Sequence, residues 1–170
     1  MNSVLERWNQ YDAFTAESEI MPCCGSRAWA QELASLRPFG DPESLLVVSD
    51  QVWSQLDIAD WDEAFASHPR IGERKAPVTA SARSAQWSSQ EQSRAATAND
   101  DIQEGLKRAN AAYEARFGRI YIVCATGKSA EEMLAILEKR LKNDDTAELR
   151  EAAEQQRQIT QIRLRKWMAL

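Results

Sequence analysis

The stretch DPESLLVVSDQVWSQL, residues 41–56, decides the fold class. Asp41 is a residue type that caps helices, and Pro42 suits the first helical position, where no backbone N–H donor is needed. Apolar residues follow at helical spacing and form one broad stripe: Leu45, Leu46, Val48, Val52 and Leu56. We therefore predict an amphipathic helix here, with one face buried in a core.

The same spacing recurs on the N-terminal side of this stretch. Apolar residues predict two short helices, over residues 4–11 and 29–36, and Pro38 ends the second. The chain therefore opens with helices.

On the C-terminal side, Asp60 is placed to cap a brief helical turn over residues 61–65. Residues 67–72, Ser-His-Pro-Arg-Ile-Gly, then combine proline with glycine, which predicts a bend at His68. Residues 76–84 lack apolar periodicity, so we expect an irregular loop there, which is a candidate lid.

The remaining chain is again helical in pattern. Residues 84–116 predict two helices with a break at 97–100, and residues 120–124 form a β-like run without a partner strand. Extended backbone is expected there, not a sheet. A capping box opens a helix over residues 129–141, and Thr146 begins the last helix.

Length and composition fit one core. With 170 residues and 44% hydrophobic content, the chain can bury that core without metals or disulfides. We expect a single compact domain over residues 1–170, all-α, with about eight or nine short helices.

Charge and cysteine usage exclude several classes of protein. The formal net charge is -5, and no basic block is present to follow a phosphate backbone, so nucleic acid is not an expected partner. Three cysteines, two of them adjacent, suit neither a disulfide framework nor a zinc site and favour a reducing compartment. No signal-like start, bilayer-length apolar run or peroxisomal C-terminal tripeptide is present. A soluble cytoplasmic protein without a membrane partner is expected.

The first candidate for chemistry is His68, the only histidine of the chain. Proline follows it at the predicted bend, where the backbone is extended and the imidazole can project into a cleft. A lone histidine also serves as an ordinary surface or core residue, and the pattern leaves that alternative open.

A second candidate group lies on the helix predicted after the loop. Ser88, Glu91 and Gln92 stand at i, i+3 and i+4, so they share one face. An amide beside a carboxylate matches the edges of a ureido or imide group, which suits a small polar heterocycle. A solvated helix face is the alternative.

The third candidate is Arg163. Ile159, Ile162 and Trp167 define an apolar arc on the last helix, and Arg163 and Lys166 both fall inside it. An arginine on such a face must extend to solvent, pair with an acid or bind an anionic ligand. The sequence contains no glycine-rich phosphate loop, dinucleotide fingerprint, serine elbow or metal-ligand cluster, so side chains must carry any chemistry.

One ordered set of motifs extends from Trp8 to Leu164, nearly the whole chain. It comprises Cys23-Cys24-Gly25-Ser26 with Trp29, Arg37-Pro38-Phe39, Asp60-Trp61, Glu63-Ala64-Phe65, Ser67-His68-Pro69-Arg70-Ile71-Gly72, Ser88-x-x-Glu91-Gln92, Phe117-Gly118, Gly127-Lys128-Ser129-Ala130-Glu131-Glu132 and Ile162-Arg163-Leu164. This set resembles the 2-oxo-4-hydroxy-4-carboxy-5-ureidoimidazoline (OHCU) decarboxylase family, whose members catalyse the third step from urate to allantoin. The combination of His-Pro-x-Ile-Gly with a later Ser-x-x-Glu-Gln is specific, although each piece alone is weak.

The resemblance implies an all-helical homodimer that converts OHCU to (S)-allantoin without a cofactor or metal. It implies an essential His68, with Glu91 and Arg163 as further catalytic residues. The substrate-binding residues that it implies are Pro69, Ser88, Ser89, Gln90, Glu91, Gln92, Arg119, Ile120, Tyr121, Ile122, Val123 and Arg163. Many relatives carry a Phe-Pro-Phe-like run where this chain reads Arg-Ile-Tyr, so side-chain contacts are expected to differ there while backbone contacts survive.

The chemistry fits these residues. Loss of carbon dioxide leaves negative charge on a carbon whose neighbours delocalise it, so the protein need only orient the carboxylate, stabilise charge and deliver a proton to one face. We expect His68 to act as the acid-base group and Arg163 to bind an anionic or carbonyl oxygen. Glu91 either holds the ring and ureido arm or orients the imidazole, and the sequence leaves both roles open. All these groups must converge on one cavity.

Two other function classes suit the same residues. A metal-free hydrolase of a ureide or imidazolone ring would use a similar pocket but release no carbon dioxide. A helical interaction domain would use His68, Glu91 and Arg163 as a buried polar network.

Overall fold

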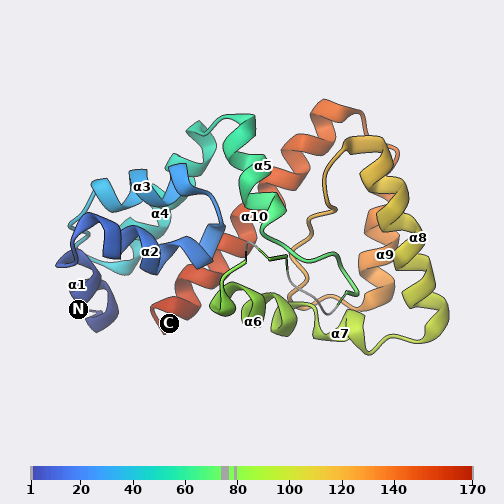
Figure 1. The fold of residues 1–170 in the computed structure, drawn as a ribbon, viewed down its shortest axis with the longest axis horizontal. Helices are drawn as coiled ribbons and strands as arrows, with labels where there is room; N and C mark the ends of the chain where they lie inside the picture. The colour runs from blue at the N-terminus through green and yellow to red at the C-terminus, as the bar shows by residue number, and fades with distance from the viewer. Residues whose placement is uncertain (1, 74–76, 79, 170) are drawn as a thin grey trace. The chain divides into compact units, whose positions relative to one another are not determined.

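The computed structural model describes residues 2–73, 77–78 and 80–169, and Figure 1 shows their helices in chain order. The described residues form ten helices, α1 (Ser3–Asn9), α2 (Ala13–Cys24), α3 (Arg27–Ser35), α4 (Pro42–Gln55), α5 (Ile58–Ala66), α6 (Ala82–Glu91), α7 (Ser93–Ala96), α8 (Asp100–Phe117), α9 (Ala130–Arg140) and α10 (Asp145–Trp167). No strand occurs in this part of the chain. The predicted all-α class is confirmed.

Helix starts follow the capping residues in the sequence. The Asp41 carboxylate accepts a hydrogen bond from the Ser44 N–H at 2.9 Å, and the Ser129 hydroxyl accepts one from the Glu132 N–H at 3.1 Å. Each cap satisfies an amide that helix geometry leaves without a partner, which stabilises the helix by about 1 kcal/mol. The helices predicted to start at these two residues are confirmed.

Helix α2 was not predicted from the sequence. Pro22 lies inside the helix, where it removes one backbone donor, and this composition resembles a helix break. The buried positions of α2 are Ala16, Ile20, Cys23 and Cys24, which form a weak apolar stripe of mostly small side chains. Because α2 packs against both α1 and α3, tertiary contacts stabilise a helix that the local pattern does not indicate.

The predicted start of α5 was wrong. The Asp60 N–H donates to Asp57 Oδ1 at 3.0 Å, so Asp57 caps this helix and Asp60 lies inside it. Both residues are aspartates three positions apart, and the sequence pattern favours neither strongly.

The region after His68 differs from its predicted boundaries. Helix α6 begins at Ala82 with Ser81 as its cap, so the last residues of the predicted loop 76–84 are helical. Residues 76 and 79 of that loop lie outside the described residues, and the lid stays a prediction. A break at Gln92 separates α6 from α7, in addition to the predicted break at 97–100.

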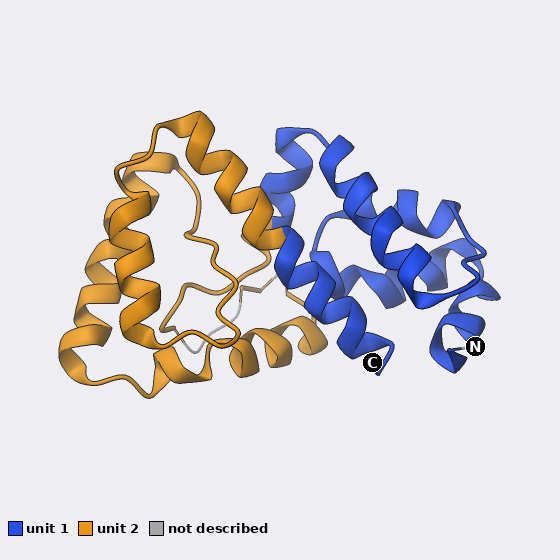
Figure 2. Cartoon of the chain, turned by 180° about the vertical axis from the view of Figure 1, so that it is seen from behind, with its two compact units in different colours: residues 1–64, 157–170 blue, residues 65–156 orange. Residues whose placement is uncertain are grey.

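The chain divides into two compact units, coloured separately in Figure 2. Unit 1 contains Met1–Ala64 and Arg157–Leu170. Its core includes Trp8 and Trp29, which are wholly buried. Their indole N–H groups donate to the Ala16 carbonyl at 2.9 Å and the Ser49 hydroxyl at 3.2 Å, so the large rings are buried without unsatisfied donors.

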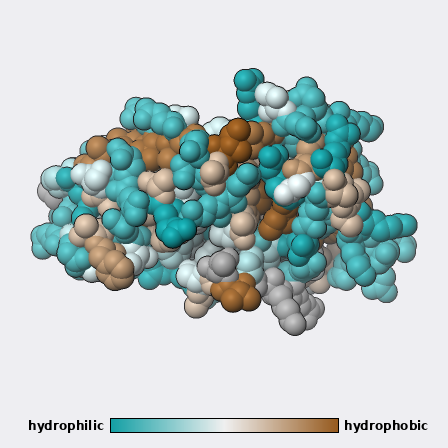
Figure 3. Space-filling view, turned by 45° about the horizontal axis from the view of Figure 1, so that its top comes forward, coloured by the Kyte–Doolittle hydropathy of each residue, from teal (hydrophilic) through white to brown (hydrophobic). Residues whose placement is uncertain are grey.

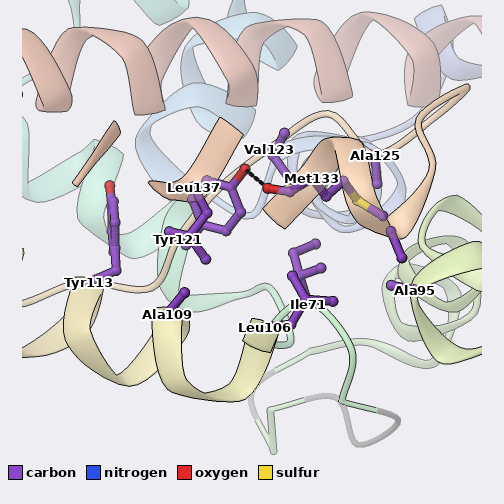
Figure 4. Close-up of a cluster of buried hydrophobic side chains, with 11 residues drawn as sticks. Ile71, Ala95, Leu106, Ala109, Tyr113, Tyr121, Val123, Ala125, Met133 and Leu137 are labelled. Carbon is purple, nitrogen blue, oxygen red and sulfur yellow. Dashed lines mark hydrogen bonds between the residues drawn. The ribbon is translucent and has the colours of Figure 1, made fainter. Parts of the chain in front are cut away.

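Unit 2 is the continuous range Phe65–Gln156. Helices α8 and α9 pack against each other and enclose an apolar cluster (Figure 4), formed by Ile71, Ala95, Leu106, Ala109, Tyr113, Tyr121, Val123, Ala125, Ala130, Met133 and Leu137. The Tyr121 hydroxyl donates to the Met133 carbonyl at 3.1 Å. The prediction of one domain over residues 1–170 stays a prediction.

Hydrophilic residues dominate the face shown in Figure 3, with hydrophobic residues scattered among them. Among the described residues, each helix is too short or too polar to serve as a membrane span.

Candidate active site

His68 lies directly after α5, at the predicted bend. Its backbone N–H donates to the Phe65 carbonyl at 3.1 Å, and the chain then leaves helical geometry. The imidazole is buried and only 7% exposed, whereas Pro69 beside it is half-buried. The structure therefore holds His68 inside unit 2.

The segment after His68 is fixed by side chains that lie far away in sequence. The Asn110 amide donates to the Ile71 carbonyl at 3.0 Å, and the Gly72 N–H donates to Gln92 Oε1 at 3.0 Å. Arg70 forms an ion pair with Glu114, with 2.7 Å between Nε and Oε1. Buried backbone groups need such partners, because an unpaired group costs about 1–3 kcal/mol.

Gly72 has a φ of +91°, which only glycine adopts without strain. A Cβ at this position would find room, since its nearest neighbour would be the Leu106 Cδ1 atom at 3.8 Å. The requirement for glycine is therefore conformational. It places the Gly72 N–H toward Gln92.

The predicted polar face at the end of α6 has a graded exposure. Ser88 and Gln92 are buried, Glu91 is half-buried, and Ser89 and Gln90 are exposed. This grading follows the i, i+3, i+4 spacing. Gln92 ends α6, and its amide oxygen is occupied by the Gly72 N–H, which orients its Nε2 group away from that contact.

The predicted segment Arg119 to Val123 is non-helical and becomes buried from Tyr121 onward. Arg140 donates to the Ile122 carbonyl at 2.6 Å, and the Cys124 N–H donates to Gln155 Oε1 at 2.8 Å. Side chains thus replace the partner strand that the sequence lacks. The expectation of extended backbone without a sheet agrees with this arrangement.

Arg140 belongs to a buried ionic network. Its guanidinium pairs with Glu148, which also accepts a hydrogen bond from the Tyr113 hydroxyl at 2.5 Å. Burial, reinforced by Glu148, raises the pKa of Tyr113, so its hydroxyl stays a donor. Burial alone would lower the pKa of Arg140, but the hydrogen bond and charge of Glu148 outweigh it and raise that pKa.

Arg163 lies in unit 1 and is wholly buried, so of the alternatives that the apolar arc leaves open its side chain does not extend to solvent. Its Nη1 group donates to the Pro22 carbonyl at 3.2 Å. Burial raises the pKa of the neighbouring Cys24 thiol to about 12, against smaller opposing effects that include the charge of Arg163. The convergence of Arg163 with the unit 2 residues stays a prediction.

Two contacts in unit 2 involve residues that the sequence analysis missed. The His68 Nε2 atom lies 2.7 Å from Gln156 Oε1, and Asn110 holds the backbone three residues after His68. Gln156 could have been found from the sequence, because it lies only about 20° around the helix from Arg163, within the apolar arc. Asn110 could not, since its partner is a backbone carbonyl distant in sequence.

A cavity of about 540 Å³ opens beside the same segment, on the side of α8. Its described lining is mostly charged or polar and comprises Arg70, Ile71, Gly72, Glu73, Asp100, Gln103, Glu104, Lys107, Asn110, Ala111 and Glu114. His68, Ser88 and Gln92 are not among these described lining residues.

Comparison with known proteins gives a consistent result. The family model described as OHCU decarboxylase matches residues 9–165. The chain is 33% identical over 150 residues to the uric acid degradation bifunctional protein TTL of Arabidopsis thaliana, covering 88% of this chain and 46% of that protein. The chain thus spans about half the length of that relative. It is 29% identical over 151 residues to the 2-oxo-4-hydroxy-4-carboxy-5-ureidoimidazoline decarboxylase of Amia calva, covering 86% of this chain and 80% of that protein.

Solved structures agree. A crystal structure of OHCU decarboxylase in the presence of (S)-allantoin matches with a TM-score of 0.77 and 30% identity, covering 89% of this chain and 98% of that chain. A crystal structure of (S)-allantoin synthase matches with a TM-score of 0.72 at 15% identity, covering 96% of this chain and 53% of that chain, which shows the shared fold. From Asn9 to Arg165, through the His68 bend, the end of α6 and the last helix, the chain belongs to the OHCU decarboxylase family.

Proposed function

We propose that this protein decarboxylates 2-oxo-4-hydroxy-4-carboxy-5-ureidoimidazoline to (S)-allantoin in urate catabolism. The observation that carries the proposal is the family match over residues 9–165, which includes every motif of the candidate site. The relative whose structure was solved in the presence of (S)-allantoin supports the same product. A buried imidazole suits this chemistry, and the segment that carries it is bonded through the Gly72 N–H to Gln92 at the end of α6.

The reaction requires little beyond positioned side chains. The carbon–carbon bond to the carboxylate breaks, its electron pair passes into the ring system, and carbon dioxide leaves. One proton is then added to a ring carbon, and adding it from one side only gives the (S) product. We propose His68 as the acid-base group, because general acid-base catalysis needs a titratable group within hydrogen-bond reach of the reacting atoms.

The remaining roles follow from chemistry and exposure. Arg163 would bind an anionic or carbonyl oxygen. Glu91 would be a further catalytic residue, which either holds the ring and ureido arm of the substrate or orients the imidazole of His68. Among the described residues no protein acceptor is seen for the Gln92 Nε2 group, which suits it to donate to a carbonyl of the ligand. Pro69 and Ser88 would line the pocket, Ser89 and Gln90 would border it from the exposed side of α6, and residues 119–123 would contribute backbone contacts.

The test couples the protein to freshly oxidised urate and follows the circular dichroism of allantoin. We expect the chain to accelerate the dichroic signal and to release one carbon dioxide per allantoin. The His68→Asn variant should lose about 10²–10⁴-fold in kcat while its helical dichroism and Tm stay close to native. Ring opening without carbon dioxide release would instead indicate a hydrolase. If the native chain shows no turnover and His68→Asn lowers Tm, an interaction domain would be favoured.

We also propose that the protein works as a homodimer in the cytoplasm. The three cysteines are buried and form no disulfide, which suits a reducing compartment. Sedimentation equilibrium tests the dimer, because a monomer mass at assay concentrations would contradict it.

A further inference from the structure

The imidazole of His68 has one ring nitrogen assigned to a specific neighbour. Nε2 lies 2.7 Å from Gln156 Oε1, although the two residues are 88 positions apart. His68 is 7% exposed and Gln156 is 0% exposed. Both residues belong to unit 2, so the contact lies within one compact body.

The chemistry of the amide decides where the proton lies. A carbonyl oxygen only accepts hydrogen bonds, so a contact with Gln156 Oε1 requires the hydrogen on His68 Nε2. A neutral imidazole carries one N–H donor and one bare acceptor nitrogen. Nδ1 is therefore the nitrogen that can accept or deliver a proton.

We propose that Gln156 is a positioning residue, which fixes the ring orientation of His68 and its Nε2–H tautomer so that Nδ1 faces the substrate. This inference rests on the proposed decarboxylase function. It also restricts Glu91, because an orienting role for that carboxylate would then require contact with Nδ1. Holding the imidazoline ring and the ureido arm of the ligand is the role of Glu91 that remains compatible with Gln156.

The surroundings of Gln156 support positioning over packing. A wholly buried amide must satisfy donors and an acceptor, whereas leucine would fill similar space without that requirement. The preceding residue has a parallel role, since Gln155 Oε1 accepts from the Cys124 N–H at 2.8 Å and its Nε2 donates to Glu151 at 2.9 Å. One turn of α10 therefore holds both His68 and the extended segment that is proposed to contact substrate.

The experiment uses the full chain with a tag that lacks histidine. His68 is the only histidine, so every imidazole ¹⁵N signal reports on it. In the native protein, above the pH at which the ring titrates, we expect a protonated Nε2 and an unprotonated Nδ1. Gln156→Leu should shift both signals toward a mixture of tautomers and lower kcat at least about 10-fold, with KM nearly unchanged.

Two further variants separate positioning from stability. Gln156→Glu keeps an oxygen acceptor at the same reach, so it should retain the Nε2–H signature and recover most of kcat. Gln161→Leu is the matched control on α10, because it loses hydrogen bonds to the Leu46 carbonyl at 2.8 Å and Asp50 at 2.7 Å. Gln161→Leu should lower Tm and leave the ¹⁵N signals and kcat unchanged.

Three outcomes would overturn the positioning role: a native Nδ1–H tautomer, native signals in Gln156→Leu, or an unchanged kcat in Gln156→Leu. If Gln156→Leu fails to fold, the native spectrum and Gln156→Glu still decide. Failure of the proposed function would give a different result. The native chain would then show no turnover, while the tautomer of His68 could still be measured.

Discussion

The first helices of unit 1 and the non-helical segments of unit 2 hold their backbones in different ways. In unit 1, Asn2, Asp12 and Ser26 each accept a hydrogen bond from a backbone N–H within three residues. In unit 2, residues 68–72 and 119–125 are held by side chains 18 to 39 positions away in the sequence. Local caps shape helices, whereas distant amides and one guanidinium shape the segments that carry the candidate site.

This difference separates two kinds of mutational effect. Losing a local cap weakens one helix end by about 1 kcal/mol and leaves the rest in place. Losing a distant partner leaves a buried group unsatisfied and also releases a segment that the reaction needs. Loss of a distant partner in unit 2 should therefore lower stability and activity together, whereas loss of a local cap in unit 1 should lower stability alone.

The largest effect is expected at Arg140. Arg140→Met leaves Glu148 buried without its cation and frees the Ile122 carbonyl, so the free energy of unfolding should fall by about 3–5 kcal/mol. Urea unfolding measures this loss. The double variant with Glu148→Leu removes both charges and should recover much of it. A single variant within 1 kcal/mol of native would contradict the proposed network.

Asn110 and Asn9 form a matched pair across the two units. Asn110→Leu removes the donor to the Ile71 carbonyl and should cost about 1–3 kcal/mol together with a clear loss of kcat. Asn9→Leu removes contacts with the Phe39 backbone at 2.8 and 3.0 Å in unit 1. It should lower stability similarly and leave kcat unchanged. Equal losses of kcat in Asn110→Leu and Asn9→Leu would contradict the difference proposed between the two units.

The cap at Asp41 should give a smaller effect. Asp41→Ala removes the acceptor for the Ser44 N–H and should lower stability by about 1 kcal/mol at native kcat. Asp41→Asn keeps an acceptor and should remain near native. Thermal unfolding followed at 222 nm by circular dichroism, a standard helix signal, checks both variants.

The smallest effect is expected in the rate at which the buried thiols are labelled. Because burial raises the pKa of Cys24 to about 12, the thiol stays protonated near pH 8, below that pKa, and should react with iodoacetamide only on opening. In Arg140→Met, Cys124 should be labelled before Cys24, since its segment loses the Ile122 anchor. Mass spectrometry of labelled peptides distinguishes the two sites. Earlier labelling of Cys24 would contradict an effect of Arg140→Met that is confined to unit 2.

Much of the fold could be predicted because its signals are local. Asp41-Pro42 and the capping box at Ser129 each indicate the start of a helix by a pattern no longer than four residues. Both helices are confirmed. Helix α2 could not be predicted, since its stability comes from packing against α1 and α3 while Pro22 indicates a break. Periodicity records one helix face and carries no information about its neighbours.

The candidate site divides along the same line. The bend at His68 and the shared face of Ser88 and Gln92 follow from residue type and spacing, and all three side chains are buried. Asn110 could not be predicted, because its target is a backbone carbonyl whose position depends on the completed fold. Gln156 was within reach, as a polar residue on the apolar arc of the last helix.

The division of α10 between the units has a consequence for the order of folding during synthesis. Unit 2 is continuous in sequence, whereas unit 1 needs residues 157–170 in addition to its first 64. Trp167 donates to Glu19 at 3.0 Å and packs edge-on against Trp8, so α1 and α2 lack these contacts until the last turn of α10 has been synthesised. On the ribosome, unit 2 can close first, and the N-terminal helices stay incomplete until Trp167 emerges from the exit tunnel.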